Sequence, residues 1–79
     1  MLRRAGLQLL AKRLKEIRSE KGLSQEELAY RSEITLSQIA RIETIRINPT
    51  VSTIFKIART LEVPLSELFN FELPPFTNE

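Results

Sequence analysis

Apolar residues recur along the chain at intervals of three and four, which is the spacing of one face of an α-helix. The first such series comprises Leu7, Leu10, Leu14 and Ile17. Gly22 follows this series as a helix stop, because glycine adopts the left-handed conformation that ends helices without a Cβ penalty. The pattern predicts a helix over about residues 7–21. A short coiled coil would use the same spacing, but it would last barely two heptads.

Two helix starts follow within a short stretch of chain. Ser24 and Glu27 form a capping box, in which the Ser24 hydroxyl accepts from the Glu27 amide and the Glu27 carboxylate accepts from the Ser24 amide. The same Ser/Thr-x-x-Glu/Gln pattern returns eleven residues later at Thr35. These starts predict helices over about 25–32 and 36–44 with a connection of three or four residues. That spacing is typical of a helix-turn-helix.

Prolines divide the second half of the chain. Pro49 disfavours helix in the residue before it, and Thr50 can then cap a helix over about 51–61. Its expected apolar stripe comprises Val51, Ile54, Phe55, Ile57, Ala58 and Leu61. Pro64 introduces a last short helix over about 65–70. The sequence shows no strand alternation and no repeat, so we predict an all-α fold of five short helices.

The chain length of 79 residues allows one small domain. We expect a single domain over 1–79, with its core at 8–70 and an extended acidic tail at 71–79. Two consecutive prolines, Pro74 and Pro75, keep that tail from being helical. No apolar run approaches the roughly 18 residues of a membrane span, and no signal-peptide core follows the first residues. We therefore expect a cytoplasmic protein.

The residue inventory excludes several kinds of chemistry. The sequence contains no cysteine, no histidine and no aspartate. Disulfides, thiolate or imidazole zinc sites and Ser-His-Asp or Cys-His catalytic groups are thereby excluded. With glutamate as the only acid, few groups remain for proton transfer. We expect no enzymatic activity, no metal and no cofactor.

Charge is distributed unevenly beneath a net charge of only +2. Residues 1–21 carry a net charge of +5, residues 22–60 carry +1, and residues 61–79 carry −4. One end can therefore face a polyanion while the other avoids it. A solvated basic helix face explains the same charges about as well.

The spaced motifs resemble those of the Xre (Cro and phage-repressor type) helix-turn-helix family. The resemblance runs through Gly22-Leu23-Ser24-Gln25-Glu26-Glu27-Leu28-Ala29, Ile34-Thr35-Leu36-Ser37-Gln38-Ile39, Arg41-Ile42-Glu43 and Asn48-Pro49-Thr50. It continues to Leu68 and covers about residues 8–70. It implies a five-helix, lambda-repressor-like domain that binds double-stranded DNA, commonly as a dimer, and regulates transcription. The second helix of the motif would enter the major groove while the first crosses the backbone.

The predicted DNA-contacting residues fall into two sets. Ile39 and Ile42 should be buried, which turns the rest of their helix outward, and amides, hydroxyls and guanidinium groups are what base edges bind. The predicted base contacts are Leu36, Ser37, Gln38 and Arg41. The predicted backbone contacts are Gln25, Thr35, Arg46, Lys12, Arg13 and Lys15. Alternatively, these side chains are only the solvated half of amphipathic helices.

The resemblance also implies an ion pair between Arg18 and Glu43 that links the first helix to the end of the recognition helix.

Two residues depart from the family pattern. Glu33 and Ile45 stand where the family commonly has glycine. A β-branched residue with positive φ is costly, so either the loop at 44–47 takes another path or strain is tolerated there. Ile45 and Ile47 could then be exposed apolar residues.

Apolar residues near the acidic end exceed what so small a domain can bury. We predict that they form an isologous dimer interface, so that two copies bind a palindromic operator. The residues are Leu65, Phe69, Phe71, Leu73 and Phe76. They could instead fold back on the domain's own core. The alternative function is an antitoxin-type or other protein-interaction module that binds a partner, such as a toxin, through its C-terminal end.

Overall fold

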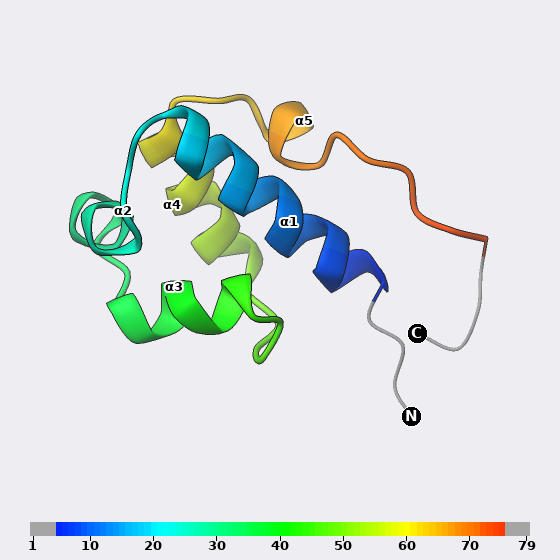
Figure 1. Ribbon diagram of the computed structural model, residues 1–79, viewed down its shortest axis with the longest axis horizontal. Helices are drawn as coiled ribbons and strands as arrows, with labels where there is room; N and C mark the ends of the chain where they lie inside the picture. The colour runs from blue at the N-terminus through cyan, green and yellow to red at the C-terminus, as the bar shows by residue number, and fades with distance from the viewer. Residues whose placement is uncertain (1–4, 76–79) are drawn as a thin grey trace.

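The computed structural model describes residues 5–75, and this part of the chain is all-helical (Figure 1). Its helices are α1 (Ala5–Glu20), α2 (Gln25–Ser32), α3 (Leu36–Glu43), α4 (Val51–Leu61) and α5 (Leu65–Leu68). The predicted all-α fold of five helices is confirmed. The bounds differ most at the ends of the chain, where α1 begins two residues earlier than expected and α5 ends two residues earlier. No described helix is long and apolar enough to cross a bilayer.

Side-chain caps begin the middle helices where the sequence predicts them. The Ser24 hydroxyl accepts from the Glu27 amide at 3.0 Å, and the Ser24 amide donates to the Glu27 carboxylate at 3.0 Å. The hydrogen bonds with the Ser24 backbone and hydroxyl hold the pKa of Glu27 below its ordinary value. The hydroxyls of Thr35 and Thr50 cap α3 and α4, each accepting from the amide three residues later.

The first four helices all end in the same backbone motif. The first residue after α2 and α4, and the second after α1 and α3, takes a left-handed conformation. The amide of the next residue donates to a carbonyl five residues back, which is the Schellman arrangement. The left-handed residues are Gly22 (φ 72°), Glu33 (φ 61°), Ile45 (φ 54°) and Glu62 (φ 58°). The residue that follows packs apolar surface inward at Leu23, Ile34 and Val63. These motifs reverse the chain sharply and keep the connections short.

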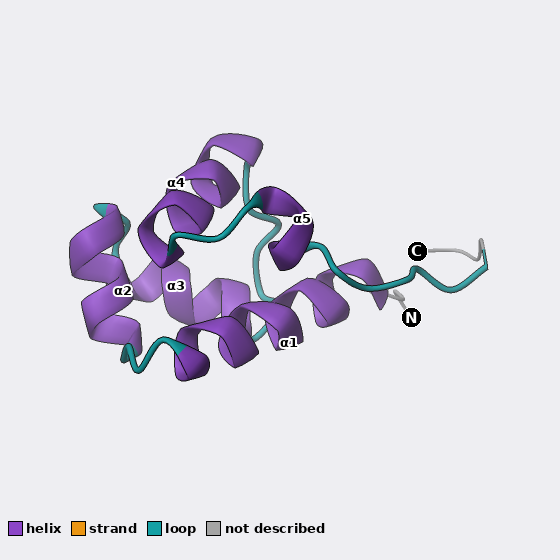
Figure 2. Cartoon of the chain, turned by 90° about the horizontal axis from the view of Figure 1, so that it is seen from above, coloured by secondary structure: helices purple, strands orange, loops and turns teal. Residues whose placement is uncertain are grey.

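The core lies between α1 on one side and α2, α3 and α4 on the other. Helix α2 packs against α3 and α4, and α1 packs against α3 and α5, as the two views show (Figure 2). Every helix contributes to this cluster. Its largest fully buried side chains are Leu14, Leu28, Ile39, Ile57, Leu61 and Leu68.

Two residues of the predicted α4 stripe are not buried. Val51 is 67% exposed and Phe55 is 44% exposed, whereas Ile54 and Ile57 lie in the core. Successive helix residues rotate by 100°, which puts Val51 and Phe55 at the edge of the stripe. Both side chains line a hollow with Leu65 of α5 and Phe69 and do not enter the core, so the predicted stripe is only partly buried.

The C-terminal segment begins against the core and then leaves it. Phe71 packs on the core, whereas Leu73 is exposed and the segment runs on as an extended chain beyond the N-terminal end of α1 (Figure 1). Arg13 fastens α5 to α1, donating to the Glu67 carbonyl at 2.7 Å and to its carboxylate at 2.9 Å. Phe76 lies outside the described residues.

Candidate nucleic-acid interface

Helix α3 presents a polar row on the side that faces away from the core. Ile39 and Ile42 are buried as predicted, and each lies beside polar positions that turn outward. The residues that the sequence predicts for base contacts are all exposed: Leu36, Ser37, Gln38 and Arg41. They provide an apolar edge, a hydroxyl, an amide and a guanidinium group on one short helix. These groups are the ones that bind base edges in a major groove.

The turn between α2 and α3 fixes the angle of that row. The Ile34 amide donates to the Ala29 carbonyl at 3.2 Å, and the Ile34 side chain is buried. Glu33, in place of the glycine of the resembling family, adopts the left-handed conformation itself. The substitution therefore keeps the geometry of the turn and adds conformational strain.

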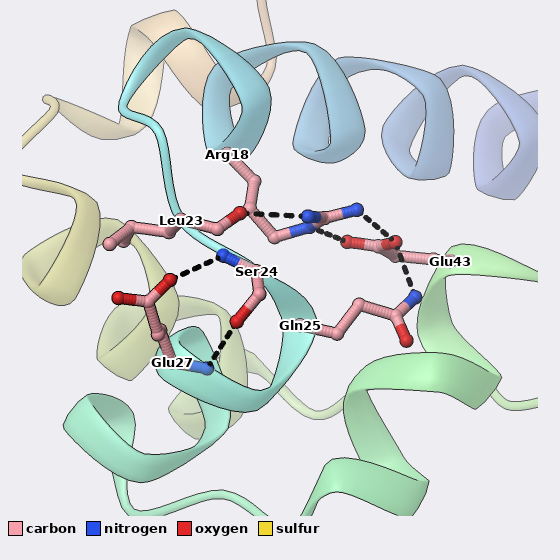
Figure 3. Close-up of polar contacts among 6 residues, drawn as sticks. All are labelled: Arg18, Leu23, Ser24, Gln25, Glu27 and Glu43. Carbon is pink, nitrogen blue, oxygen red and sulfur yellow. Dashed lines mark hydrogen bonds and ion pairs between the residues drawn. The ribbon is translucent and has the colours of Figure 1, made fainter.

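A buried carboxylate braces the far end of α3 (Figure 3). Glu43 is only 4% exposed, and its two oxygens accept from Arg18 at 2.7 and 3.0 Å. Arg18 also donates to the Leu23 carbonyl at 2.8 Å, so α1 and the loop that follows it are held together. The Arg18–Glu43 pair that the resemblance implied is confirmed, and it joins α1 to the recognition helix.

Gln25 joins the same network from the start of α2. Its side-chain nitrogen donates to Glu43 at 2.8 Å, which links the two helices of the motif directly (Figure 3). An amide nitrogen carries two hydrogens, so one remains for a phosphate oxygen. Gln25 therefore braces the recognition helix, and its predicted contact with the DNA backbone stays a prediction. Sequence reasoning did not identify Glu43 as the acceptor that Gln25 uses.

The loop after α3 contains a left-handed residue although its side chain is β-branched. Ile45 adopts φ 54°, and the Arg46 amide donates to the Arg41 carbonyl at 2.7 Å. Of the two alternatives, strain is therefore the one that the structure shows. Ile45 and Ile47 are half-buried rather than exposed, and Ile47 packs on the core. Arg46 is exposed next to the end of α3, where its predicted phosphate contact remains open.

The basic residues of α1 do not share one surface. Arg13 is paired with Glu67 on α5, so its guanidinium group is directed away from α3. Lys12 lines a hollow with the C-terminal segment. Lys15 lies one turn before Arg18, and hence on the side of α1 that faces α3. The phosphate contacts predicted for these residues stay predictions, and Lys15 is the best placed.

The predicted dimer residues are also divided. Leu65 and Phe69 are partly exposed and line an apolar hollow with Pro49, Val51, Ile54 and Phe55. Phe71 packs on the core instead, and Leu73 lies on the extended segment. Val51 and Phe55 are the members of this surface that sequence reasoning missed. Their place at the edge of the α4 stripe was the available signal.

Metal chemistry finds no support in the described part of the chain. Residues 5–75 contain no group of three or more histidine, cysteine, aspartate or glutamate side chains that could hold a metal ion. What the surface of α3 offers is non-covalent binding through hydroxyl, amide and guanidinium groups.

Comparisons with known proteins identify the family of the chain. The model of a helix-turn-helix family (HTH_3) matches residues 14–68. The HTH-type transcriptional regulator PuuR of Escherichia coli is 42% identical over 59 residues, which are 75% of this chain and 32% of that protein. The chain thus spans about a third of that relative's length. An uncharacterized HTH-type transcriptional regulator of Sinorhizobium fredii, y4dJ, is 38% identical over 76% of this chain and 78% of its own length.

A solved structure of similar size shows the same architecture. The restriction-modification controller protein C.AhdI from Aeromonas hydrophila superposes with a TM-score of 0.81 at 38% sequence identity. The match covers 84% of this chain and 100% of that one. The wild-type controller protein C.Esp1396I gives a TM-score of 0.80 at 34% identity over 86% of this chain and 88% of its own.

Proposed function

The chain belongs to the Xre/Cro-type helix-turn-helix family, and from that membership we propose that it binds a specific double-stranded DNA sequence and regulates transcription as a repressor or autoregulator. The observation that carries the proposal is the exposed polar row of α3, held at a fixed angle by the buried Glu43 carboxylate. A recognition helix must be rigid, because its side chains have to meet base edges within hydrogen-bond distance. A protein with this role acts in the compartment that holds the DNA, and we therefore place it in the cytoplasm.

Base reading is assigned to the first turns of α3. Gln38 pairs with adenine through its amide, and Arg41 pairs with guanine N7 and O6 through its guanidinium fork. Ser37 accepts or donates at either purine, and Leu36 lies against a thymine methyl group. The four side chains are exposed, so no rearrangement of the core is needed for them to enter the groove.

Phosphate contacts hold the helix in place. The Thr35 hydroxyl accepts from the Gln38 amide and still has its own hydrogen to donate to a phosphate oxygen. Gln25 keeps a second amide hydrogen, and Arg46 is exposed at the other end of α3. Contacts from both ends of a recognition helix fix its register on the duplex without reading sequence.

We assign dimerisation to the apolar hollow between α4 and α5. Seven large hydrophobic side chains are exposed among the described residues, and four of them line this one hollow: Val51, Phe55, Leu65 and Phe69. None of its lining residues belongs to α3, so a second copy can bind there while both recognition helices face DNA. A two-fold contact of this kind predicts a palindromic operator with half-sites about one helical turn apart.

The test is a selection of bound sequences from a pool of random duplexes with the wild-type chain. A palindrome with half-sites about one helical turn apart supports the dimeric regulator. Tight binding to all sequences with no enriched motif would contradict sequence-specific regulation. No binding to any duplex, even at low salt, would favour the alternative of a protein-interaction module that recognises a partner through its C-terminal end.

A further inference from the structure

A second basic surface lies between α2 and α4, away from the recognition helix. It is a hollow of about 200 Å³ whose lining residues are Arg31, Ser32, Glu33, Lys56, Arg59 and Thr60. Helices α2 and α4 pack against each other, with α2 at the left of the molecule in Figure 1. No residue of α3 contributes to it, so the proposed base-reading surface does not account for its charge.

None of the cations of this hollow is held by a short contact within the described residues, although Arg31 lies close enough to Glu27, one turn earlier on α2, to help lower its pKa. Across residues 5–75, no hydrogen bond or ion pair engages the side chains of Arg31, Lys56 or Arg59. The arginines that hold the fold together are different, because Arg13 and Arg18 both make short contacts with a carboxylate. Unpaired arginines therefore occur at α3, where DNA is proposed to bind, and again here.

The arrangement suits an anion with several oxygens. Lys56 and Arg59 lie one turn apart on α4, and Arg31 faces them from the end of α2. Thr60 adds a hydroxyl. Guanidinium groups bind phosphate oxygens through paired hydrogen bonds, and an ammonium group adds a compact charge. Glu33 is the one acid among the lining residues, so the hollow keeps a net positive charge.

We propose that this hollow, the α2–α4 groove, is a second binding site for phosphate groups. The favoured source is the backbone of DNA that flanks the half-site read by α3, and this part rests on the proposed function. Arg31 lies six residues beyond Gln25, about 9 Å along α2. Flanking DNA that bends toward α2 would bring its phosphates to the groove, so the site would favour bendable flanks.

The test uses Arg59→Gln, which removes one charge from the groove, and Gln8→Glu as a control of equal charge change. Gln8 is exposed and belongs to the N-terminal half of α1, and Figure 1 shows that this end of the helix points away from α2. Each variant is titrated with the selected operator, either trimmed to its core or extended by about ten base pairs on each side. Arg59→Gln should weaken the extended duplex about tenfold and lower its salt slope by about one, with little effect on the trimmed duplex.

A variant that removes a negative charge from the groove distinguishes an effect of charge from an effect of misfolding, because it should strengthen binding. Glu33→Gln removes the acid from the groove, so it should tighten the extended duplex, whereas Glu72→Gln on the C-terminal segment should not. A second arm needs no operator: inorganic pyrophosphate is added to the free protein, and the amide resonances of Ser32 and Thr60 are followed. Shifts in the wild type that disappear in Arg59→Gln would assign the site to free phosphate compounds.

The outcomes separate the two proposals. If Arg59→Gln weakens binding to the extended duplex, the phosphates are those of flanking DNA. If Arg59→Gln abolishes only the shifts that pyrophosphate causes, the ligand is a small phosphate-bearing molecule. If neither the extended duplex nor pyrophosphate distinguishes Arg59→Gln from Gln8→Glu, the phosphate site is wrong. If selection yields no operator but pyrophosphate still binds, the proposed function fails and the groove stands.

Discussion

Glu43→Ala is the substitution that bears most directly on how α3 is held. The Glu43 carboxylate accepts hydrogen bonds at 2.7, 2.8 and 3.0 Å and is 4% exposed. Its removal leaves two donor nitrogens of Arg18, Nε and Nη2, and the Gln25 side-chain amide without their acceptor, and only the hydrogen bond from Arg18 to the Leu23 carbonyl remains. Breaking a buried ion pair by removing one partner costs about 3–5 kcal/mol. Because the Arg18 side chain is still 18% exposed, we expect the lower end of that range, about 3 kcal/mol.

That loss is large for a chain of this size. At about 0.05–0.15 kcal/mol per residue, a 79-residue domain has a free energy of unfolding of about 4–12 kcal/mol. Urea denaturation followed by circular dichroism measures the change through the midpoint and slope. Glu67→Ala is the matched control, because the Arg13–Glu67 pair also joins α1 to another helix but its carboxylate side chain is 51% exposed. It should cost less than about 1 kcal/mol.

A double substitution separates stability from orientation. Arg18→Met with Glu43→Leu replaces the pair by apolar side chains of similar length, which commonly restores stability. Gln25 still loses its acceptor, so we expect near-normal unfolding together with weaker binding to the operator. Equal costs for Glu43→Ala and Glu67→Ala, both below about 1 kcal/mol, would refute the claim that the carboxylate braces the recognition helix.

Three further predictions concern the ends of helices and the dimer. Glu62→Gly should raise the free energy of unfolding by up to about 1 kcal/mol, because glycine adopts the left-handed conformation without strain. Glu26→Gly inside α2 should lower it by a similar amount, and urea denaturation that shows both variants changing stability in the same direction would contradict this. The lowered pKa of Glu27 means that its contribution is present above its ordinary value of 4.5 and lost as the pH falls through the folded value. Glu27→Gln should therefore flatten the decline of melting temperature in acid, and an unchanged pH profile would count against it. Phe69→Lys should shift sedimentation from dimer to monomer and weaken operator binding, and a persistent dimer would move the interface elsewhere.

The sequence predicts the local structure well, because caps and stops act over three or four residues. Ser24 and Thr35 begin their helices as expected, and Gly22 ends α1 in the left-handed conformation. Backbone propensity disfavours a left-handed isoleucine, so the sequence alone does not predict the conformation of Ile45. The strain persists because the hydrogen bond from the Arg46 amide to the Arg41 carbonyl and the half-buried Ile45 side chain keep the turn in place.

Relations between distant elements are predicted less well. The Arg18–Glu43 pair followed from the family resemblance, but nothing local reveals that Arg13 binds Glu67 fifty-four residues away. The exposed edge of α4 also depends on packing between elements that are distant in the sequence. A stripe of apolar residues shows which face turns inward, whereas the width that is buried depends on which helices lie beside it. Val51 and Phe55 lie past that limit.

Base reading by α3 can be tested by a parallel selection of bound sequences with the wild-type chain and with Gln38→Ala. Gln38 is exposed in the first turn of α3, and loss of a bidentate contact should cost about 1–3 kcal/mol at one base pair in each half-site. We predict that the variant still selects the palindrome but loses its preference at that one symmetric position. An identical motif for both proteins would contradict base reading by this helix, and so would a uniform loss of affinity with every preference retained.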